Sequence, residues 1–469
     1  MQTNNLSKSY LIKTLGCKAN FSDSQALESE LQKRGWIPAY DDSHADLCIV
    51  NSCTVTNEAD KQSRGVAKRV AKKNPKTAVV FTGCGAEVDP SSYKSAPGIH
   101  YVMGNQNKPE LIETIIQKLE QRTALPTQAE ILGSVTDYVD IKSRHPIDRE
   151  WPMPIGMNPD QWLESGNTAR TRVFLKIQEG CNSFCTYCII PYGRGPNRSL
   201  RPRIIVDQIN NLVKAGVREV VLTGTNIGDY GTDWSENGTL MLDELIKQIL
   251  DHTSLERLRV SSLDPTEITD PLMELMESNS RFCPHFHVSL QSPHSKVLKL
   301  MKRKYDETQA RDCLTKLSKL KPKAGGQVFV GMDLITGFPG EGETEFQETY
   351  DWLKTQYWNR LHVFPYSERV GTPATKLTYS VPKHIRSERA KILMELSLNR
   401  LQGFYHETLR SQPKLEDILA EGNSGYTPHY LKVMFDREIP SNELVSARPY
   451  EVIIDRASGD VSFLARTIS

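Results

Sequence analysis

The segment VFLKIQEGCNSFCTYCIIPYGRG, residues 173–195, places an apolar strand directly before three closely spaced cysteines. Cys181, Cys185 and Cys188 have the spacing C-x3-C-x2-C, and an arginine- and glycine-rich stretch follows them. If the strand is the first of a parallel barrel, Cys181 lies at its carboxyl end, on the face where barrels build active sites. The segment therefore predicts a thiolate site at the mouth of a barrel.

The number of cysteines indicates what this site holds. A four-iron cluster has four iron corners, and cysteine thiolates are their usual ligands. Three cysteines leave one iron open, so that a cofactor can chelate it. A structural zinc ion would need a fourth ligand, and no further Cys or His lies near residues 181–188. The pattern favours the cluster, with zinc as the alternative.

Length and composition limit the remaining possibilities. A chain of 469 residues is too long for one core, which predicts two to four domains. The net charge of +1 means that any site for a polyanion must be a local patch. No apolar run approaches the roughly 20 residues that span a bilayer, and the N-terminus lacks the apolar core of a signal peptide. We therefore expect a cytoplasmic protein without a membrane partner, whose nine cysteines serve metal binding or catalysis rather than disulfides.

Residues 8–125 alternate strand-like and helix-like segments, which predicts an N-terminal open parallel α/β sheet. The expected strands are 10–17, 45–53 and 77–84, and the expected helices are 24–36, 58–75 and 108–122.

Each of the three expected strands ends at a cysteine, namely Cys17, Cys53 or Cys84. The carboxyl ends of parallel strands meet at one edge, so these cysteines should converge, and Asn20 and Asn51 could donate hydrogen bonds to their sulfur atoms. The alternative is that they are unrelated small buried residues. The other cysteines, Cys48, Cys283 and Cys313, are interpreted as structural.

Three further regions follow. Residues 126–168 are rich in Pro, Trp and Gly and are interpreted as a linker or lid. Residues 169–400 contain a second alternating series, which predicts a partial or full parallel (β/α) barrel. Its expected strands are 173–180, 219–226, 257–265, 285–292, 328–338 and 361–367. Residues 405–469 predict a small all-β domain with Gly turns.

The segment around Cys181 resembles the radical S-adenosylmethionine (SAM) superfamily, and its continuation CTYCIIPYGRG is similar to the methylthiotransferase family. The resemblance extends over residues 10–375. It implies that Cys181, Cys185 and Cys188 hold a [4Fe-4S] cluster whose open iron binds SAM. It also implies that Cys17, Cys53 and Cys84 hold a second [4Fe-4S] cluster with an iron open to a sulfur species. Residues at strand ends would contact SAM, with Tyr187 near the adenine: Tyr187, Gly224, Thr225, Ser262, Gln291 and Arg303.

The C-terminal region resembles a TRAM domain, a small β-barrel that binds RNA. Tyr426 and Tyr430 could stack on bases, and Lys432 could contact phosphate. Arg194, Arg198 and Arg201, beside the cysteine cluster, are further candidates for substrate contacts. The basic residues of 61–76 form one helical face, which is either an RNA contact or an ordinary solvated surface.

The resemblance implies an enzyme that uses radical chemistry to place a methylthio group on a base of transfer RNA. TLGCKAN around Cys17 and GYTPHY at 425–430 resemble the enzymes that act at C2 of N6-threonylcarbamoyladenosine at position 37. Partners would be tRNA, a low-potential electron donor and a sulfur donor. Alternatives are action on N6-isopentenyladenosine in tRNA, action on a ribosomal protein, and a non-enzymatic iron–sulfur sensor that binds RNA.

Overall fold

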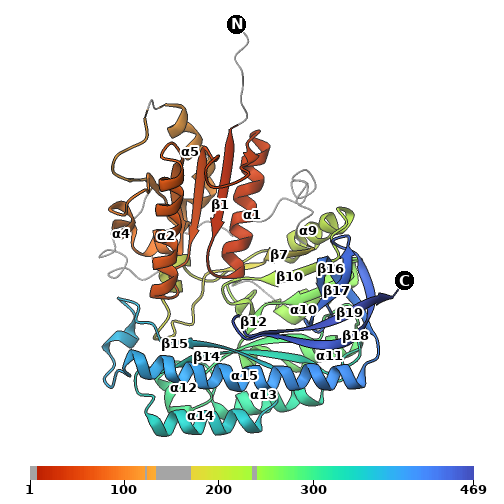
Figure 1. The fold of residues 1–469 in the computed structure, drawn as a ribbon. Helices are drawn as coiled ribbons and strands as arrows, with labels where there is room; N and C mark the ends of the chain where they lie inside the picture. The colour runs from red at the N-terminus through yellow and green to blue at the C-terminus, as the bar shows by residue number, and fades with distance from the viewer. Residues whose placement is uncertain (1–7, 122–123, 134–170, 235–239, 469) are drawn as a thin grey trace.

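A computed structural model describes residues 8–121, 124–133, 171–234 and 240–468. It contains an N-terminal α/β layer, a central barrel and a small C-terminal β-barrel (Figure 1). The predicted fold class is confirmed. Most of the expected linker or lid at 126–168 lies outside the described residues. No helix in the described ranges is long and apolar enough to cross a membrane.

The N-terminal sheet has six parallel strands in the order β2-β1-β3-β4-β5-β6. The strands β3 and β4 at its centre are buried along their whole length. The bounds are β1 Ser9–Thr14, β2 Ile37–Pro38, β3 Leu47–Ser52, β4 Ala78–Gly83, β5 Tyr101–Val102 and β6 Glu130–Ile131. Since β6 pairs with β5, the sheet continues beyond residue 125, the expected end of the domain.

The helices of this layer start at different positions from those expected. The first helix, α1, begins directly after Cys17 instead of at residue 24. Pro109 lies in a 3-10 turn, so the helix expected from 108 begins three residues later. The bounds are α1 Lys18–Lys33, α2 Asn57–Lys73, α3 Cys84–Val88, α4 Pro90–Lys94, η1 Asn105–Glu110 and α5 Leu111–Glu120.

The central unit is a partial barrel of parallel strands that follow one another in chain order. The third strand is interrupted at Ser261, so β11 pairs with β10 while its continuation β12 pairs with β13. The bounds are β7 Arg172–Lys176, β10 Glu219–Thr223, β11 Arg257–Val260, β12 Ser262–Leu263, β13 His285–Gln291, β14 Phe329–Thr336 and β15 Arg360–Pro365.

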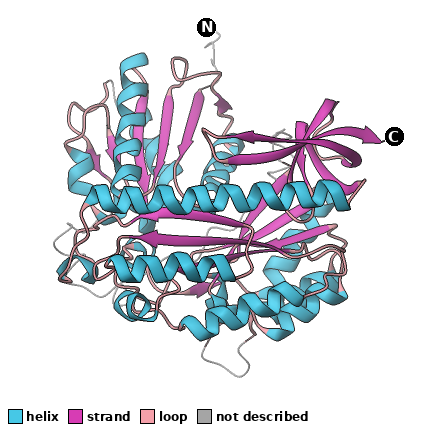
Figure 2. Cartoon of the chain, turned by 60° about the horizontal axis from the view of Figure 1, so that its bottom comes forward, coloured by secondary structure: helices cyan, strands magenta, loops and turns pink. Residues whose placement is uncertain are grey.

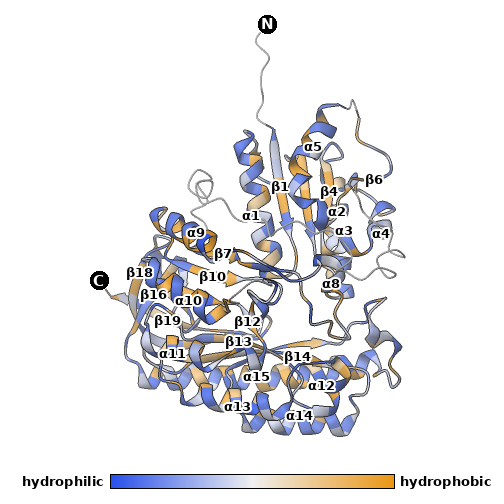
Figure 3. Ribbon diagram, turned by 180° about the vertical axis from the view of Figure 1, so that it is seen from behind, coloured by the Kyte–Doolittle hydropathy of each residue, from blue (hydrophilic) through white to orange (hydrophobic). Residues whose placement is uncertain are grey.

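Helices cover the outer face of the barrel, and apolar residues are concentrated in the strands while polar residues cover the outer helices (Figure 3). These helices are α9 Pro202–Lys214, α10 Leu242–His252, α11 Asp270–Ser278, α12 Ser295–Met301, α13 Glu307–Lys319 and α14 Glu343–Thr355. Short elements lie between them: β8 Gln178–Glu179, α8 Ile190–Arg194, β9 Arg198–Ser199, η3 Ile227–Asp229, η4 Pro265–Glu267 and η5 Pro373–Lys376.

A long helix that the sequence analysis did not predict, α15 (Lys383–Ser411), joins the barrel to the C-terminal domain. It runs along the molecule and packs on β14, β15, β18 and β19 (Figure 2). The helix is continuous through residues 400–405, where the expected domain boundary lies. The C-terminal domain itself begins with β16, four residues after the helix ends.

The C-terminal domain is a closed four-stranded barrel with the order β16-β17-β19-β18. Its strands are β16 Leu415–Tyr426, β17 Lys432–Ile439, β18 Leu444–Asp455 and β19 Asp460–Ile468. Tyr405 of α15 packs on Phe463 in its core, with 4.6 Å between ring centroids.

Arg257 fixes this domain to the central barrel. Its guanidinium donates hydrogen bonds to the carbonyl oxygens of Asp417, Tyr426 and Thr427 at 2.9–3.0 Å. It also forms an ion pair with the buried Glu219 at 2.7 Å.

We predict that Arg257→Met destabilises the protein by about 2–4 kcal/mol, because three carbonyl groups of the C-terminal domain lose their donor and the buried Glu219 keeps, among the described residues, only Arg259 as an ion-pair partner. Amide hydrogen exchange in residues 415–468 should increase most. The control is Arg218→Met, which removes a solvent-exposed pair with Glu256 and should change stability by less than about 1 kcal/mol. Equal exchange in the two variants would contradict the proposed role of Arg257.

Candidate functional site

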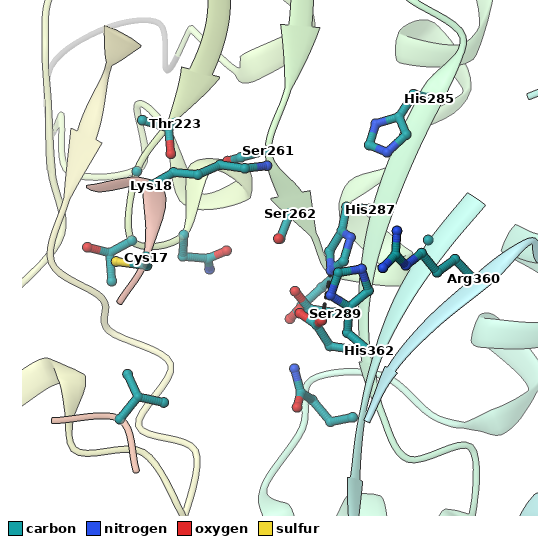
Figure 4. A pocket seen from close by; sticks show the side chains of 18 of the residues that line it. Cys17, Lys18, Thr223, Ser261, Ser262, His285, His287, Ser289, Arg360 and His362 are labelled. Carbon is teal, nitrogen blue, oxygen red and sulfur yellow. Dashed lines mark ion pairs between the residues drawn. The ribbon is translucent and has the colours of Figure 1, made fainter. Parts of the chain in front are cut away.

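A cavity of about 650 Å³ lies between the carboxyl edge of the N-terminal sheet, the inner face of the barrel and the C-terminal domain (Figure 4). All three parts of the chain contribute to its lining. The residues that carry its chemistry include Cys17, Lys18, Cys181, Cys185, Tyr187, Cys188, Arg194, Gly224, Thr225, Ser262, His285, His287, Gln291, Arg303, Asp333, Arg360, His362, Tyr426, Tyr430 and Lys432.

The barrel cysteines lie together on the wall of this cavity. Arg303 Nη1 is 3.1 Å from Cys185 Sγ, and the Ser183 amide donates to Cys181 Sγ at 3.4 Å. Burial raises the pKa of Cys181 and Cys188, and Cys185 raises that of Cys188 further. Without a bound cation these groups are thiols. Buried sulfur atoms that already receive hydrogen bonds fit a metal cluster, because iron stabilises the thiolate form.

The N-terminal cysteines also converge, as the strand ends predicted. Gly16 has φ +96°, and a Cβ atom there would lie 2.6 Å from Cys53 Cβ, so only glycine permits this approach. Burial raises the pKa of Cys53 to about 12, and the nearby Cys84 and Cys17 act in the same direction. Of these three cysteines only Cys17 lines the cavity, since Cys53 and Cys84 are buried behind it.

The side chain that donates to sulfur in this trio is Asn105, whose Nδ2 is 3.5 Å from Cys84 Sγ. The expectation that Asn20 and Asn51 would do so is wrong. The Asn20 amide donates to the carbonyls of Leu15 and Ser52, and the Asn51 amide donates to Asn20 O and Ser24 Oγ. Both asparagines therefore fix the backbone around the cysteines instead.

The short helix α8 connects the two cysteine trios. It begins two residues after Cys188 and packs on α3, which starts at Cys84. A Cβ atom on Gly193 would lie 3.3 Å from Cys84 Cβ. Asn105 Nδ2 also donates to the Gly193 carbonyl at 2.7 Å. The two trios thus flank one cavity and are separated by a single helix.

Arg194 ends α8 and is only 1% exposed. Its guanidinium forms ion pairs with Asp23 and Glu179 and donates to Asn20 Oδ1. Lys108 and Lys176 also pair with Asp23, which makes a buried charge network between α1 and the barrel. Arg194 was predicted to contact substrate. It lines the cavity, but its charge is already balanced by carboxylates within the chain.

The six residues expected to contact SAM all line the cavity: Tyr187, Gly224, Thr225, Ser262, Gln291 and Arg303. The turn at Gly224 is held by Gln178, whose Oε1 accepts the amides of Thr225 and Asn226 at 3.0 and 2.9 Å. Arg303 pairs with Asp264 while it reaches Cys185. Gln291 has φ +57°, a strained conformation of the kind that persists at functional sites.

Polar side chains on the inner face of the barrel form a part of the site that the sequence analysis missed. His287 Nε2 lies 2.8 Å from Asp333 Oδ1, and its ring meets His362 edge to face at 5.1 Å. Burial lowers the pKa of His362 to about 4, and His287 acts in the same direction, so His362 is neutral at pH 7. The alternation in HFHVSLQ, residues 285–291, contained the signal, because every second residue of this strand faces inward.

Lys18 was also missed, and it extends from the Cys17 side of the cavity toward the barrel strands (Figure 4). Burial lowers the pKa of its ammonium group. Tyr430 and Asp333 act in the opposite direction, and the Arg259 guanidinium acts in the same direction as burial.

The residues predicted to bind RNA fall into two groups. Tyr426 and Tyr430 stack on each other at 5.0 Å and line the end of the cavity together with Lys432. Arg172 lies over both rings, so this aromatic pair also joins the C-terminal domain to the barrel. The second group, Arg198 and Arg201, lies outside the cavity lining.

Of these two, Arg198 donates to the carbonyls of Arg194 and Pro196. Arg201 lies 4.7 Å from the Trp234 ring centroid.

Among the described residues, no three His, Cys, Asp or Glu side chains are grouped tightly enough to hold a metal ion.

Fold and site together define a radical SAM enzyme. The Radical SAM superfamily matches residues 175–353, and the Uncharacterized protein family UPF0004 matches residues 9–104. The structure is similar to that of the radical SAM methyltransferase TsrM from Kitasatospora setae, solved with cobalamin and a [4Fe-4S] cluster bound. The TM-score is 0.53 at 13% identity, with 79% of this chain and 77% of that chain covered. At this identity the likeness concerns the fold alone.

Sequence relatives define the family. A threonylcarbamoyladenosine tRNA methylthiotransferase MtaB from Bacillus subtilis is 36% identical over 90% of this chain and 89% of its own length. The protein of the same name from Aquifex aeolicus is 34% identical over 90% of this chain and 95% of its own length. A tRNA-2-methylthio-N(6)-dimethylallyladenosine synthase from Clostridium botulinum is 31% identical over 88% of this chain and 86% of its own length. The chain belongs to the radical SAM methylthiotransferase family, as its motifs predicted, and enzymes of this class use SAM and [4Fe-4S] clusters.

We predict that anaerobic reconstitution gives about eight irons per chain, the content of two four-iron clusters. Replacing Cys181, Cys185 and Cys188 together by Ala should halve this value, because the N-terminal trio remains. Cys48→Ser is the control, since Cys48 lies within β3 and away from both trios. Full iron content in the triple variant, measured by a colorimetric iron assay, would refute the assignment.

Proposed function

We propose that this enzyme transfers a methylthio group to C2 of N6-threonylcarbamoyladenosine at position 37 of tRNA. The observation that carries the proposal is the single cavity that both cysteine trios flank, because the chemistry needs a radical source and a sulfur source at one carbon atom. The relatives named for threonylcarbamoyladenosine are 33–36% identical, and those named for dimethylallyladenosine are 31% identical.

The cysteines would divide the work between the trios. Cys181, Cys185 and Cys188 would hold the cluster at which SAM binds, and Cys17, Cys53 and Cys84 would hold the cluster that carries sulfur. When bound, SAM would supply the 5′-deoxyadenosyl radical and the methyl group, and the second cluster would supply the sulfur atom. The unactivated C2–H bond requires such chemistry, since no side-chain acid or base can ionise it.

The remaining residues would bind and orient the reactants. Arg303 would keep Cys185 and Tyr187 in place while Asp264 balances its charge. Gly224 and Thr225, held by Gln178, together with Ser262 and Gln291, would contact SAM. Tyr426, Tyr430 and Lys432 would contact RNA at the far end of the cavity. Arg198 and Arg201 would serve the RNA backbone outside it, where phosphate contacts fix position but do not select a base.

The proposal also extends to the surroundings of the enzyme. We place it in the cytoplasm with tRNA, a low-potential electron donor and a donor of sulfur. We divide it into an N-terminal domain to about residue 133, a barrel with its long helix from 171 to 411, and an RNA-binding domain from 415.

We predict that the two trios can be separated by mutation. Cys17→Ala should keep SAM cleavage without RNA but abolish methylthio transfer, because it damages only the sulfur-carrying site. Cys185→Ala should lose both activities. The measurement is 5′-deoxyadenosine formation by liquid chromatography, beside mass spectrometry of nucleosides from tRNA bearing threonylcarbamoyladenosine.

The same assay separates the alternatives. Wild-type enzyme should modify tRNA with the threonylcarbamoyl group faster than tRNA with the isopentenyl group. Preference for the isopentenyl substrate would reject the substrate assignment and keep the methylthiotransferase. A wild-type protein that forms no 5′-deoxyadenosine would instead be a sensor.

A further inference from the structure

The cationic side chains that line the cavity differ in whether they are already paired. Arg194 pairs with Asp23 at 3.0 Å, Arg303 pairs with Asp264, and Arg360 pairs with Asp460 at 2.9 Å. The lysines that line the cavity, Lys18 and Lys432, have ammonium groups without a hydrogen bond or ion pair among the residues that the structure describes. The site therefore offers positive charge to a ligand at two places.

Lys18 is the first residue of α1 and directly follows Cys17. Figure 4 shows its side chain pointing across the cavity from Cys17 toward Ser261. An ammonium group that is partly removed from water and has no hydrogen bond or ion pair is stabilised by an anion that binds beside it. Lys18 lies beside Cys17 of the sulfur-carrying trio, and this position determines which part of a substrate its side chain can contact.

The chemistry of the base identifies the anion. In adenine, C2 and the exocyclic N6 lie on the same edge, one on each side of N1. A base that presents C2 to the sulfur carried near Cys17 therefore presents its N6 substituent to the neighbouring surface. The threonylcarbamoyl substituent ends in a carboxylate, whereas the isopentenyl substituent is entirely apolar.

We propose that Lys18 binds the carboxylate of the threonylcarbamoyl group and thereby selects the substrate, an inference that rests on the function proposed above. The other cations fit this role less well. Arg198 and Arg201, which also lie beside the cysteine cluster in the sequence, do not line the cavity. Lys432 belongs to β17 in the C-terminal domain, and this domain contacts the first residues of barrel strands, Arg172, Arg257 and Arg360, while the cysteines lie at carboxyl ends.

The test uses the reconstituted enzyme and two anticodon stem-loop RNAs. One carries threonylcarbamoyladenosine, and the other carries the same nucleoside with its carboxylate converted to the neutral amide. Wild-type enzyme should favour the acid over the amide by roughly 10- to 100-fold in kcat/KM, the range for a hydrogen bond to a charged group. In the Lys18→Met variant, kcat/KM for the acid should fall by this factor, while kcat/KM for the amide should stay at the wild-type value. Lys18→Arg should restore most of the preference.

Two controls carry the same substitution elsewhere. Lys33 lies at the far, exposed end of α1, and the Lys33→Met variant should retain the full preference for the acid. Lys432→Met lies in the same cavity and should weaken both RNAs by the same factor. Iron content shows whether Lys18→Met disturbs the neighbouring cluster. If it does, fluorescence anisotropy of the two labelled RNAs still measures the preference, because RNA binding is read directly.

The outcomes separate this inference from the proposed function. Turnover of acid and amide at equal rates by wild-type enzyme would overturn the role of Lys18 and leave the function standing. If Lys18→Met keeps the preference for the acid unchanged, another residue binds the carboxylate. If its activity falls equally on both RNAs, Lys18 contacts a phosphate instead of the carboxylate. Failure of wild-type enzyme on the acid, with turnover of an isopentenyl stem-loop, would reject the proposed function itself.

Discussion

Asp23 is fully buried and forms ion pairs with three cationic side chains, and the relative position of the two cysteine trios depends on these contacts. It lies on α1 and pairs with Lys108, with Lys176 of β7 and with Arg194 of α8. Burial alone raises the pKa of its carboxyl group, but the three cations hold that pKa well below its usual range. Loss of Asp23 would leave the buried ammonium group of Lys108 without its ion pair, and breaking a buried pair in this way costs about 3–5 kcal/mol. The network therefore fixes the N-terminal sheet on the barrel in one orientation.

The same network sets the charge around the thiolates. Burial raises the pKa of Cys84, while Arg194 and Lys108 lower it. On the other side of the cavity, Arg303 reaches Cys185 and is balanced by Asp264. Each trio is thus served by an arginine whose own charge is neutralised by a carboxylate. This arrangement places positive charge near the sulfur atoms of both trios without a large excess of positive charge in the protein interior.

Much of this site could be predicted from the sequence, because its cysteines lie shortly after strands in the chain. Three cysteines at the ends of parallel strands must converge, whatever the details of the helices between them. In the same way, a strand followed by C-x3-C-x2-C defines the mouth of the barrel. The expected strand positions were correct to within a few residues for these reasons, since buried parallel strands are short apolar runs.

Contacts between distant residues could not be predicted in this way. Arg194 and Asp23 are 171 positions apart, so the arginine appeared to be a free substrate contact. The start of α1 was missed because Asn20, Asp23 and other polar residues there are buried against the barrel, whereas polar residues normally indicate an exposed segment. The long helix α15 was missed because it packs on two different domains and has no single apolar face.

The pairing of charges explains how a chain with a net charge of only +1 can select an anionic nucleoside. Along the inner face of the barrel Asp333 lies 2.8 Å from His287, and Arg360 is matched by Asp460. Where the neighbouring arginines are matched by carboxylates, an unmatched ammonium group determines the local potential, and it acts more strongly than it would in water. A site built for a carboxylate also rejects the apolar analogue, because binding it would leave the buried cation unpaired. Selection at Lys18 thus depends less on the number of positive residues than on the neutralisation of the arginines that line the cavity.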